Sequence, residues 1–172
     1  GGSVPEHWLA WLKTELENQG NEIFFPALPR DDFPQKNEWL KTIFELPIQW
    51  NENVILVGHS LGCPTILRIL EKLKPEQKIG KAILAAGFAK TLKVVPIENF
   101  VSEPFDWLKI KSQSKKFVVM NSDNDPKVPR HHGLFLAEQL GVAETVEKNA
   151  GHITAPQFGP YPRILKIIMQ SD

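Results

Sequence analysis

The sequence predicts an α/β fold, a doubly wound and mostly parallel sheet with helices on both faces. Short apolar runs rich in β-branched residues alternate along the chain with segments whose apolar residues recur at helical spacing. This alternation favours a parallel sheet. The run Val-Ile-Leu-Val at 54–57 is apolar throughout, as expected of a strand buried on both faces. A chain of 172 residues can bury a substantial core, so we expect a single domain over 1–172.

Turn and breaker residues bound the predicted elements. Gly20 follows the first helix, Pro47 closes the helix that contains Trp39, and Gly141 stops a later helix. The segment 88–113 is irregular apart from one short helix. The expected helices cover 6–19, 39–44, 66–73, 105–110, 134–140 and 163–169. The expected strands cover 22–25, 54–57, 81–86, 116–120 and 142–146.

Composition argues against several classes of protein. Twenty basic and twenty acidic side chains cancel, so nothing indicates nucleic acid or an anionic membrane as a partner. No apolar run approaches the length of a bilayer span. The single cysteine, Cys63, excludes an internal disulfide and a Cys-based metal cluster, and it favours a reducing compartment. We therefore expect a cytoplasmic protein with no metal site and no cofactor.

The pentapeptide Gly-His-Ser-Leu-Gly at 58–62 carries the strongest chemical signal. It lies between a buried-strand pattern and an amphipathic helix, the setting of the nucleophile elbow of α/β-hydrolases. Ser60 is then the nucleophile, and the backbone N–H of Leu61 points toward the oxyanion at the positive end of the helix. We expect Gly58 and Gly62 to remove side chains that would clash where the strand and the helix approach each other.

An acid and a base are expected after later strands, in the chain order serine, acid, histidine. His152 fits the base, because it follows Gly151 in a loop after a late strand. Two aspartates compete for the acid. Asp125 is favoured, since the following Pro126 biases it toward extended geometry. Asp123 is expected to cap or shape the turn.

Other residues near these motifs have less specific patterns. His59 precedes the nucleophile, and at an elbow its side chain should point the other way, which predicts a hydrogen-bonded core histidine. Cys63 is expected to be a small buried packing residue rather than a second nucleophile. For Phe105 and Trp107, core packing is an alternative to a place in the pocket wall. The candidates for the substrate pocket are Gly2, Ser3, His59, Phe105, Trp107 and Phe158.

With these motifs in place, the chain resembles the family of small α/β-hydrolases that includes retinoblastoma-binding protein 9 and the YdeN-like hydrolases. The resemblance covers nearly the whole chain. It implies a compact hydrolase with a minimal lid that acts on small esters or amides, and it places the triad on Ser60, Asp125 and His152. The segments that carry it are Gly1-Gly2, Trp-Leu-Ala-Trp-Leu-Lys at 8–13, the Trp39 helix, the elbow, Pro-Phe-Asp-Trp at 104–107, Lys-Ile-Lys at 109–111, Asp125-Pro126 and Gly151-His152.

The chain departs from this family at its start. Such proteins begin with a strand that runs into a His-Gly-x-Gly-Gly loop, and the backbone of that loop supplies the second oxyanion N–H. Gly1-Gly2 resemble the end of the loop. We therefore expect the first central strand and the second oxyanion donor to lie upstream of Gly1.

The sequence-based expectation is a serine hydrolase that cleaves small carboxylic esters or amides through an acyl-enzyme. Two alternatives stay open. The same triad supports acyl transfer to an acceptor other than water, and a protein-binding module could retain the hydrolase fold without catalysis. The expected partner is a small-molecule ester or amide. A protein partner is not readable from the sequence.

Overall fold

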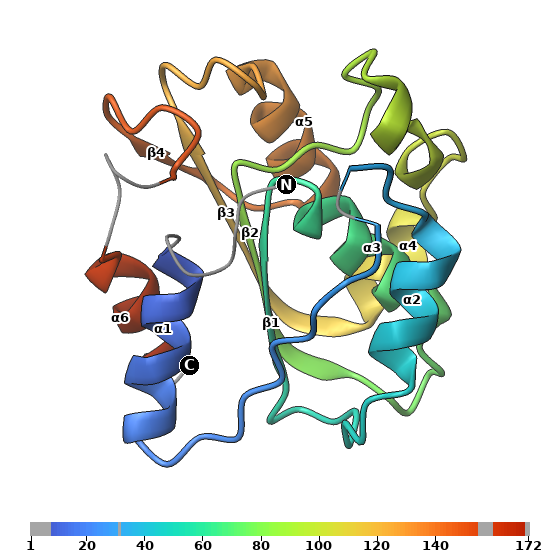
Figure 1. The fold of residues 1–172 in the computed structure, drawn as a ribbon, viewed down its shortest axis with the longest axis vertical. Coiled ribbons are helices and arrows are strands. Elements are labelled where there is room, and N and C mark those ends of the chain that lie inside the picture. The colour runs from blue at the N-terminus through green and yellow to red at the C-terminus, as the bar shows by residue number, and fades with distance from the viewer. Residues whose placement is uncertain (1–7, 31, 155–159, 171–172) are drawn as a thin grey trace.

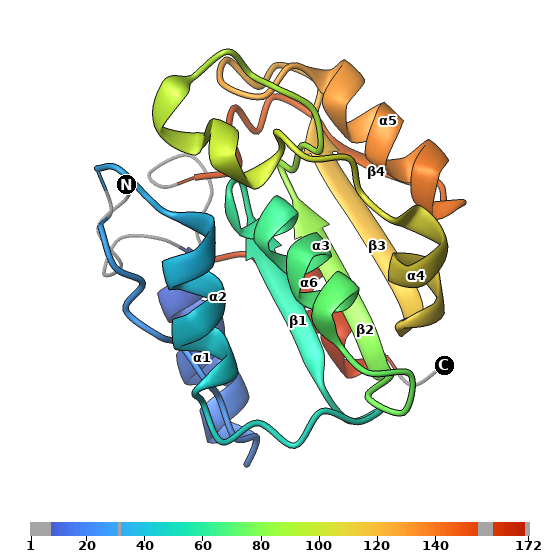
Figure 2. The same ribbon diagram turned by 90° about the vertical axis from the view of Figure 1, so that its right-hand side faces the viewer.

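The computed structural model describes residues 8–30, 32–154 and 160–170, which form helical layers on both sides of one sheet (Figures 1 and 2). The described sheet has four strands in the order β1-β2-β3-β4, and every neighbouring pair is parallel. The predicted α/β class with a parallel sheet is thus confirmed. The strands are β1 (Ile55–His59), β2 (Ile79–Ala85), β3 (Ser114–Ser122) and β4 (Glu144–Glu147).

Two hydrophobic clusters fill the space on the two faces of the sheet. One cluster packs against α2 (Lys36–Phe44), α3 (Gly62–Lys72), α4 (Trp107–Ser112) and α5 (Arg130–Leu140). The other packs against α1 (Trp8–Asn18) and α6 (Pro162–Met169), which lie together on the opposite side in Figure 1. The chain between β2 and α4 contains a short 3-10 helix, η2 (Val95–Phe100).

The alternation of side chains along β2 explains why residues 82–85 of that strand are all apolar. Ala82 and Leu84 belong to the first cluster, whereas Ile83 and Ala85 belong to the second. Successive side chains of a strand point to opposite faces, so a strand covered on both sides has no polar face. The apolar run at 54–57 was expected to be buried on both faces, but it is only half-buried because β1 forms an edge of the described sheet.

The strand predicted at 22–25 is wrong, since these residues have no regular secondary structure. A strand needs a neighbour to accept and donate its backbone hydrogen bonds, and the sheet pairs only β1 to β4 among the described residues. The apolar run Ile-Phe-Phe at 23–25 indicates that this segment favours burial, but it cannot indicate whether a partner strand lies beside it. The expected strand upstream of Gly1 stays a prediction.

Several elements extend beyond their apolar patterns, and two of them show the reason. The strand predicted at 116–120 runs from Ser114 to Ser122, and the helix predicted at 134–140 begins at Arg130, directly after Pro129. Polar residues occupy the added positions, so hydrophobic periodicity could not detect them. The added Asn121 and Ser122 are buried all the same.

Within the part of the chain that the structure describes, no helix is both long and apolar enough to cross a bilayer.

Candidate active site

Ser60 lies in a sharp turn at the carboxyl end of β1, directly before α3. Its φ is +52°, a left-handed conformation that a serine rarely adopts. The turn is tied to the next strand, because the Ser60 N–H donates to the carbonyl of Ala85 over 2.9 Å. Leu61 is the N-cap residue of α3, so its N–H has no acceptor within that helix. Both features are those of a nucleophile elbow.

The two glycines of the motif are not equivalent. A Cβ added at Gly58 would lie 2.7 Å from the backbone carbon and oxygen of Gly62 and 2.8 Å from Cδ1 of Ile66. A Cβ added at Gly62 meets nothing within 4 Å. The expectation that both glycines relieve a clash is therefore right for Gly58 and wrong for Gly62, whose contribution is the backbone that Gly58 approaches.

Asp125 and His152 form a buried acid–base pair. His152 Nδ1 lies 2.8 Å from Asp125 Oδ2, and the two side chains are 7% and 2% exposed. The other carboxylate oxygen, Oδ1, accepts the backbone N–H groups of Lys127 and Val128 over 2.8 and 2.9 Å. With both oxygens engaged, the carboxylate has a fixed orientation and holds Nδ1 of His152.

The environment of Asp125 favours its ionised form. Burial by itself would raise the pKa of this carboxyl, but the hydrogen bonds from His152, Val128 and Lys127 and the charge of His152 outweigh burial. The pKa of Asp125 is therefore lower than that of an ordinary aspartate. A carboxylate that stays ionised can stabilise a neighbouring imidazolium.

A polar turn that begins at Ser122, the last residue of β3, holds the loop of His152, and sequence reasoning assigned that role to none of its residues. Asp123 was expected only to shape the turn. Backbone N–H groups of residues 149, 150 and 151 donate to Asp123 Oδ1, Ser122 Oγ and Asn124 Oδ1, over 2.8, 3.2 and 2.8 Å. The run Ser-Asp-Asn at 122–124 was the available signal, because such side chains readily accept backbone N–H groups.

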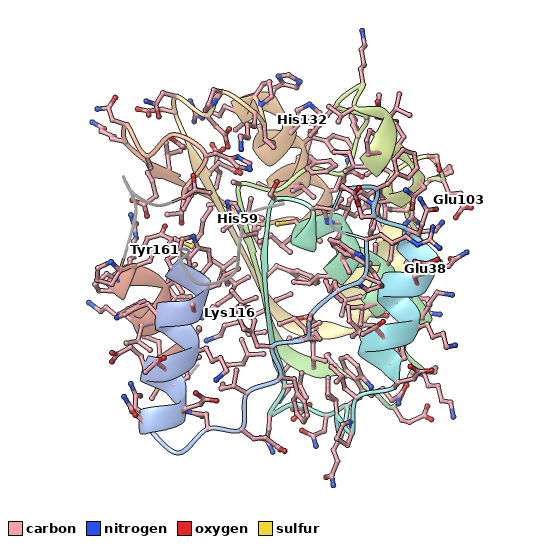
Figure 3. All side chains as sticks on the ribbon, viewed as in Figure 1. Glu38, His59, Glu103, Lys116, His132 and Tyr161 are labelled. Carbon is pink, nitrogen blue, oxygen red and sulfur yellow. The ribbon has the colours of Figure 1, made fainter. Side chains whose placement is uncertain are left out.

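His59 connects the elbow to the base as a hydrogen-bonded histidine, and its place in a pocket wall stays a prediction. Its Nε2 lies 2.7 Å from the backbone carbonyl oxygen of His152, and the two ring centroids are 4.8 Å apart. Figure 3 shows His59 at the carboxyl end of β1. Among the described residues, no hydrogen bond joins the Ser60 hydroxyl to His152. In free enzymes this bond is commonly long and tightens when substrate binds.

The aromatic pocket candidates lie in packing contacts. The Phe105 ring stacks under the Arg68 guanidinium at 3.7 Å, and Trp107 packs on Phe105 and on Phe135 of α5. These contacts support the alternative of core packing for both rings. The remaining pocket candidates, Gly2, Ser3 and Phe158, lie outside the described residues.

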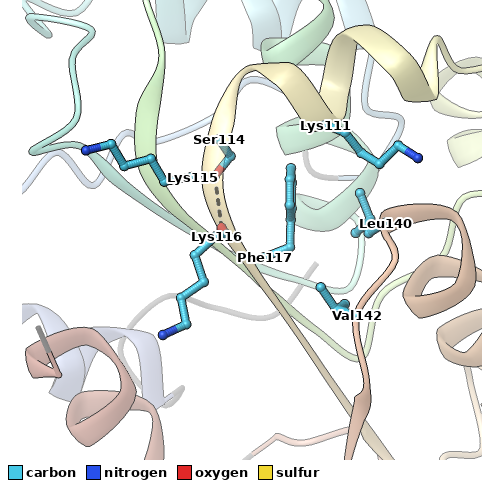
Figure 4. Close-up of a pocket in the computed structure, with 7 residues that line it drawn as sticks. All are labelled: Lys111, Ser114, Lys115, Lys116, Phe117, Leu140 and Val142. Carbon is cyan, nitrogen blue, oxygen red and sulfur yellow. Dashed lines mark hydrogen bonds between the residues drawn. The ribbon is translucent and has the colours of Figure 1, made fainter. Parts of the chain in front are cut away.

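A surface groove of about 370 Å³ lies at the beginning of β3, around Phe117, Leu140 and Val142 (Figure 4). The acid loop follows the other end of the same strand, after Ser122. The groove is therefore not the place where a substrate would meet Asp125 and His152.

Cys63 is the other nucleophile type near the elbow. It is fully buried, its Sγ contacts the carbonyls of Gly58 and Ala85 at 3.4 Å, and burial raises the pKa of its thiol far above the ordinary value. This confirms a packing residue, because the thiolate is the reactive form.

Across the described residues, no group of three His, Cys, Asp or Glu side chains could hold a metal ion.

Comparison with known proteins identifies the class that this fold and site define. The family model described as serine hydrolase matches residues 1–170. The chain belongs to this serine hydrolase family, and it is a hydrolase with the α/β-hydrolase fold.

Individual relatives agree with that assignment. The chain is 36% identical over 151 residues to the YdeN hydrolase of Bacillus subtilis (strain 168), which covers 87% of this chain and 80% of that protein. The crystal structure of the B. subtilis ydeN product superposes with a TM-score of 0.90 at 33% identity, over 97% of this chain and 91% of that one. The serine hydrolase RBBP9 of Rattus norvegicus is 24% identical over 173 residues, with 98% of this chain and 90% of that protein covered. The predicted YdeN/RBBP9-like family is thus confirmed.

Proposed function

We propose that this hydrolase cleaves small carboxylic esters or amides through an acyl-enzyme formed on Ser60. The observation that carries the proposal is the buried pair of Asp125 and His152, joined over 2.8 Å and linked through His59 to the strained turn of Ser60. A serine hydroxyl is a weak nucleophile and needs an oriented base to become active. A buried, fixed carboxylate behind a histidine is the arrangement that orients such a base.

Each residue of the triad has one proposed role. His152 accepts the proton of Ser60 as the hydroxyl attacks the carbonyl carbon, and it later gives that proton to the leaving alcohol or amine. Asp125 keeps the proton of the imidazole on Nδ1, which leaves Nε2 as the base, and it stabilises the imidazolium. Water then attacks the acyl-enzyme with His152 as base and releases the acid and free Ser60.

The oxyanion is stabilised by backbone donors in the proposed mechanism. The N–H of Leu61 is one donor, because it lies at the start of α3 without an acceptor in the helix. The second donor, expected upstream of Gly1, stays a prediction. A cytoplasmic location is also proposed, and the free, buried Cys63 supports it because such thiols are usual in reducing compartments.

Covalent labelling tests the proposal directly. The protein is treated with a fluorophosphonate, and the adduct is located by peptide mass spectrometry. We expect labelling on Ser60, its loss in Ser60→Ala, and no change in Ser102→Ala, which removes an exposed serine hydroxyl far along the chain. Unlabelled folded protein, or an adduct on another residue, would contradict the proposed nucleophile.

The acyl and leaving groups are tested separately. A series of p-nitrophenyl esters of increasing acyl length and a series of aminoacyl amides are compared by kcat/KM. We expect hydrolysis of at least one short ester and none by Ser60→Ala. Turnover that requires an added alcohol or amine acceptor would instead favour acyl transfer.

A further inference from the structure

The loop that carries His152 has an unusual backbone. Asn149, Gly151 and Ile153 have φ values of +53°, +54° and +50°. Glycine adopts this region freely, but for a β-branched residue such as Ile153 it is a real outlier. A strained loop of this kind keeps its shape only where its surroundings fix it from several sides.

On the side of the acid, the turn of residues 122–124 accepts three backbone N–H groups of the loop. The opposite side is held by two ring donors that bind loop carbonyls. Trp8 Nε1 donates to the carbonyl of Ile153 over 2.8 Å, and His59 Nε2 lies 2.7 Å from the carbonyl oxygen of His152. A carbonyl oxygen can only accept, so Nε2 of His59 carries the proton.

Among the hydrogen bonds to this loop named above, the one from His59 comes from the strand that leads to Ser60. Trp8 belongs to α1, whereas His59 is the last residue of β1 and is bonded covalently to Ser60. The rings of Trp8 and His59 pack nearly perpendicular to each other, with centroids 6.1 Å apart at an interplanar angle of 89°, which limits rotation of the imidazole. The strand that presents the nucleophile is thereby connected to the backbone of the base.

We propose that His59 is a positioning residue that sets the distance between Ser60 and His152 by binding the backbone of His152. The inference rests on the proposed function of Ser60 and His152. Asp125 fixes the direction of the His152 ring, and among the described residues its hydrogen bonds go to Lys127, Val128 and His152 and not to the elbow, so these bonds do not set this distance. The ring contact of 4.8 Å between His59 and His152 supports the same fixed spacing.

The expected effect is on the chemical step. A displacement of about 1 Å between reacting groups can lower a rate by about 100-fold. His59→Phe keeps an aromatic ring but removes the donor, so we expect kcat to fall by about 10- to 100-fold with little change in KM. His59→Gln retains an N–H that can reach the carbonyl, and we expect it to recover part of the lost rate.

The experiment compares rates of fluorophosphonate labelling and of p-nitrophenyl acetate hydrolysis. Trp8→Phe is the matched control, since it removes a hydrogen bond to the same loop that does not start at the elbow. We expect Trp8→Phe to lower thermal stability and leave both rates close to wild type. Equal losses of rate in Trp8→Phe and His59→Phe would overturn the inference, as would a wild-type rate in His59→Phe.

Two features of the design separate this inference from the proposed function. If wild-type protein is neither labelled nor active, the proposed function fails. If wild type is labelled on Ser60 and His59→Phe is labelled equally fast, only the positioning role fails. Should His59→Phe not fold, nitrogen NMR of the wild-type imidazoles decides, because the inference requires a proton on Nε2 of His59 and an unprotonated Nε2 would overturn it.

Discussion

Replacing Ser60 by glycine should remove the nucleophile and also release backbone strain. The φ of +52° at Ser60 costs a residue with a side chain roughly 1–2 kcal/mol, and this cost is absent for glycine. Glycine also gives the unfolded chain more freedom, which costs about 0.4–1 kcal/mol relative to alanine. The two terms leave Ser60→Gly more stable than Ser60→Ala by about 0.8 kcal/mol.

The assay is urea unfolding of the two inactive variants, compared at equal m-values so that the difference in midpoint reports a difference in stability. In a chain of this size the expected gain corresponds to about 2–3 °C in Tm. Lys93 has a φ of +58° and is exposed, so glycine should also exceed alanine there. At Lys41, in the middle of α2, the order should reverse.

A Ser60→Gly variant less stable than Ser60→Ala would refute the reasoning. That result would mean that the turn relaxes to an unstrained conformation once the hydroxyl is gone. The strain would then belong to the serine side chain and not to the geometry of the strand and helix.

Four further predictions concern packing, charge and reactivity around the site. Gly58→Ala should lower the free energy of unfolding by about 1–3 kcal/mol, because its Cβ would lie 2.7 Å from the backbone of Gly62. Gly62→Ala should be nearly neutral, since a Cβ there meets nothing within 4 Å. Urea midpoints of the two variants test both expectations. Because the pKa of Asp125 is lowered in the folded protein, its carboxylate stabilises the fold above the usual pKa of an aspartate, and this contribution is lost as pH falls. The free energy of unfolding of Asp125→Asn should therefore depend less on pH than that of wild type between about pH 5 and pH 2. Parallel curves of the two proteins would contradict this. Asp125→Asn should also lower kcat by about 10⁴-fold in a steady-state ester assay. Cys63 should resist iodoacetamide in folded protein and react once urea unfolds it; rapid native alkylation would show that it is not buried.

The sequence by itself determined the features that depend on local order along the chain. The elbow at Ser60 follows from a strand pattern, a short motif and a helix pattern in direct succession. The choice of Asp125 over Asp123 used the following proline, and the structure places Asp125, not Asp123, against His152. The helices were found from apolar residues at helical spacing, and the paired strands from short apolar runs between turn residues.

The tertiary structure decided everything that depends on which surfaces meet. Periodicity tells which face of an element is apolar but not what covers it, so the run at 23–25 looked like a strand although no neighbour pairs with it. Aromatic character left Phe105 and Trp107 open between a pocket wall and core packing, and only the folded chain brings them into contact with Arg68 and Phe135, which supports core packing. The hydrogen bonds that hold the His152 loop join residues that are far apart in the sequence. Asn149 and Asp123 are 26 positions apart, and Trp8 and Ile153 are 145 positions apart, so only folding brings such partners together. A sequence records the donors and acceptors, while their distances and the backbone strain that they oppose exist only in the folded chain.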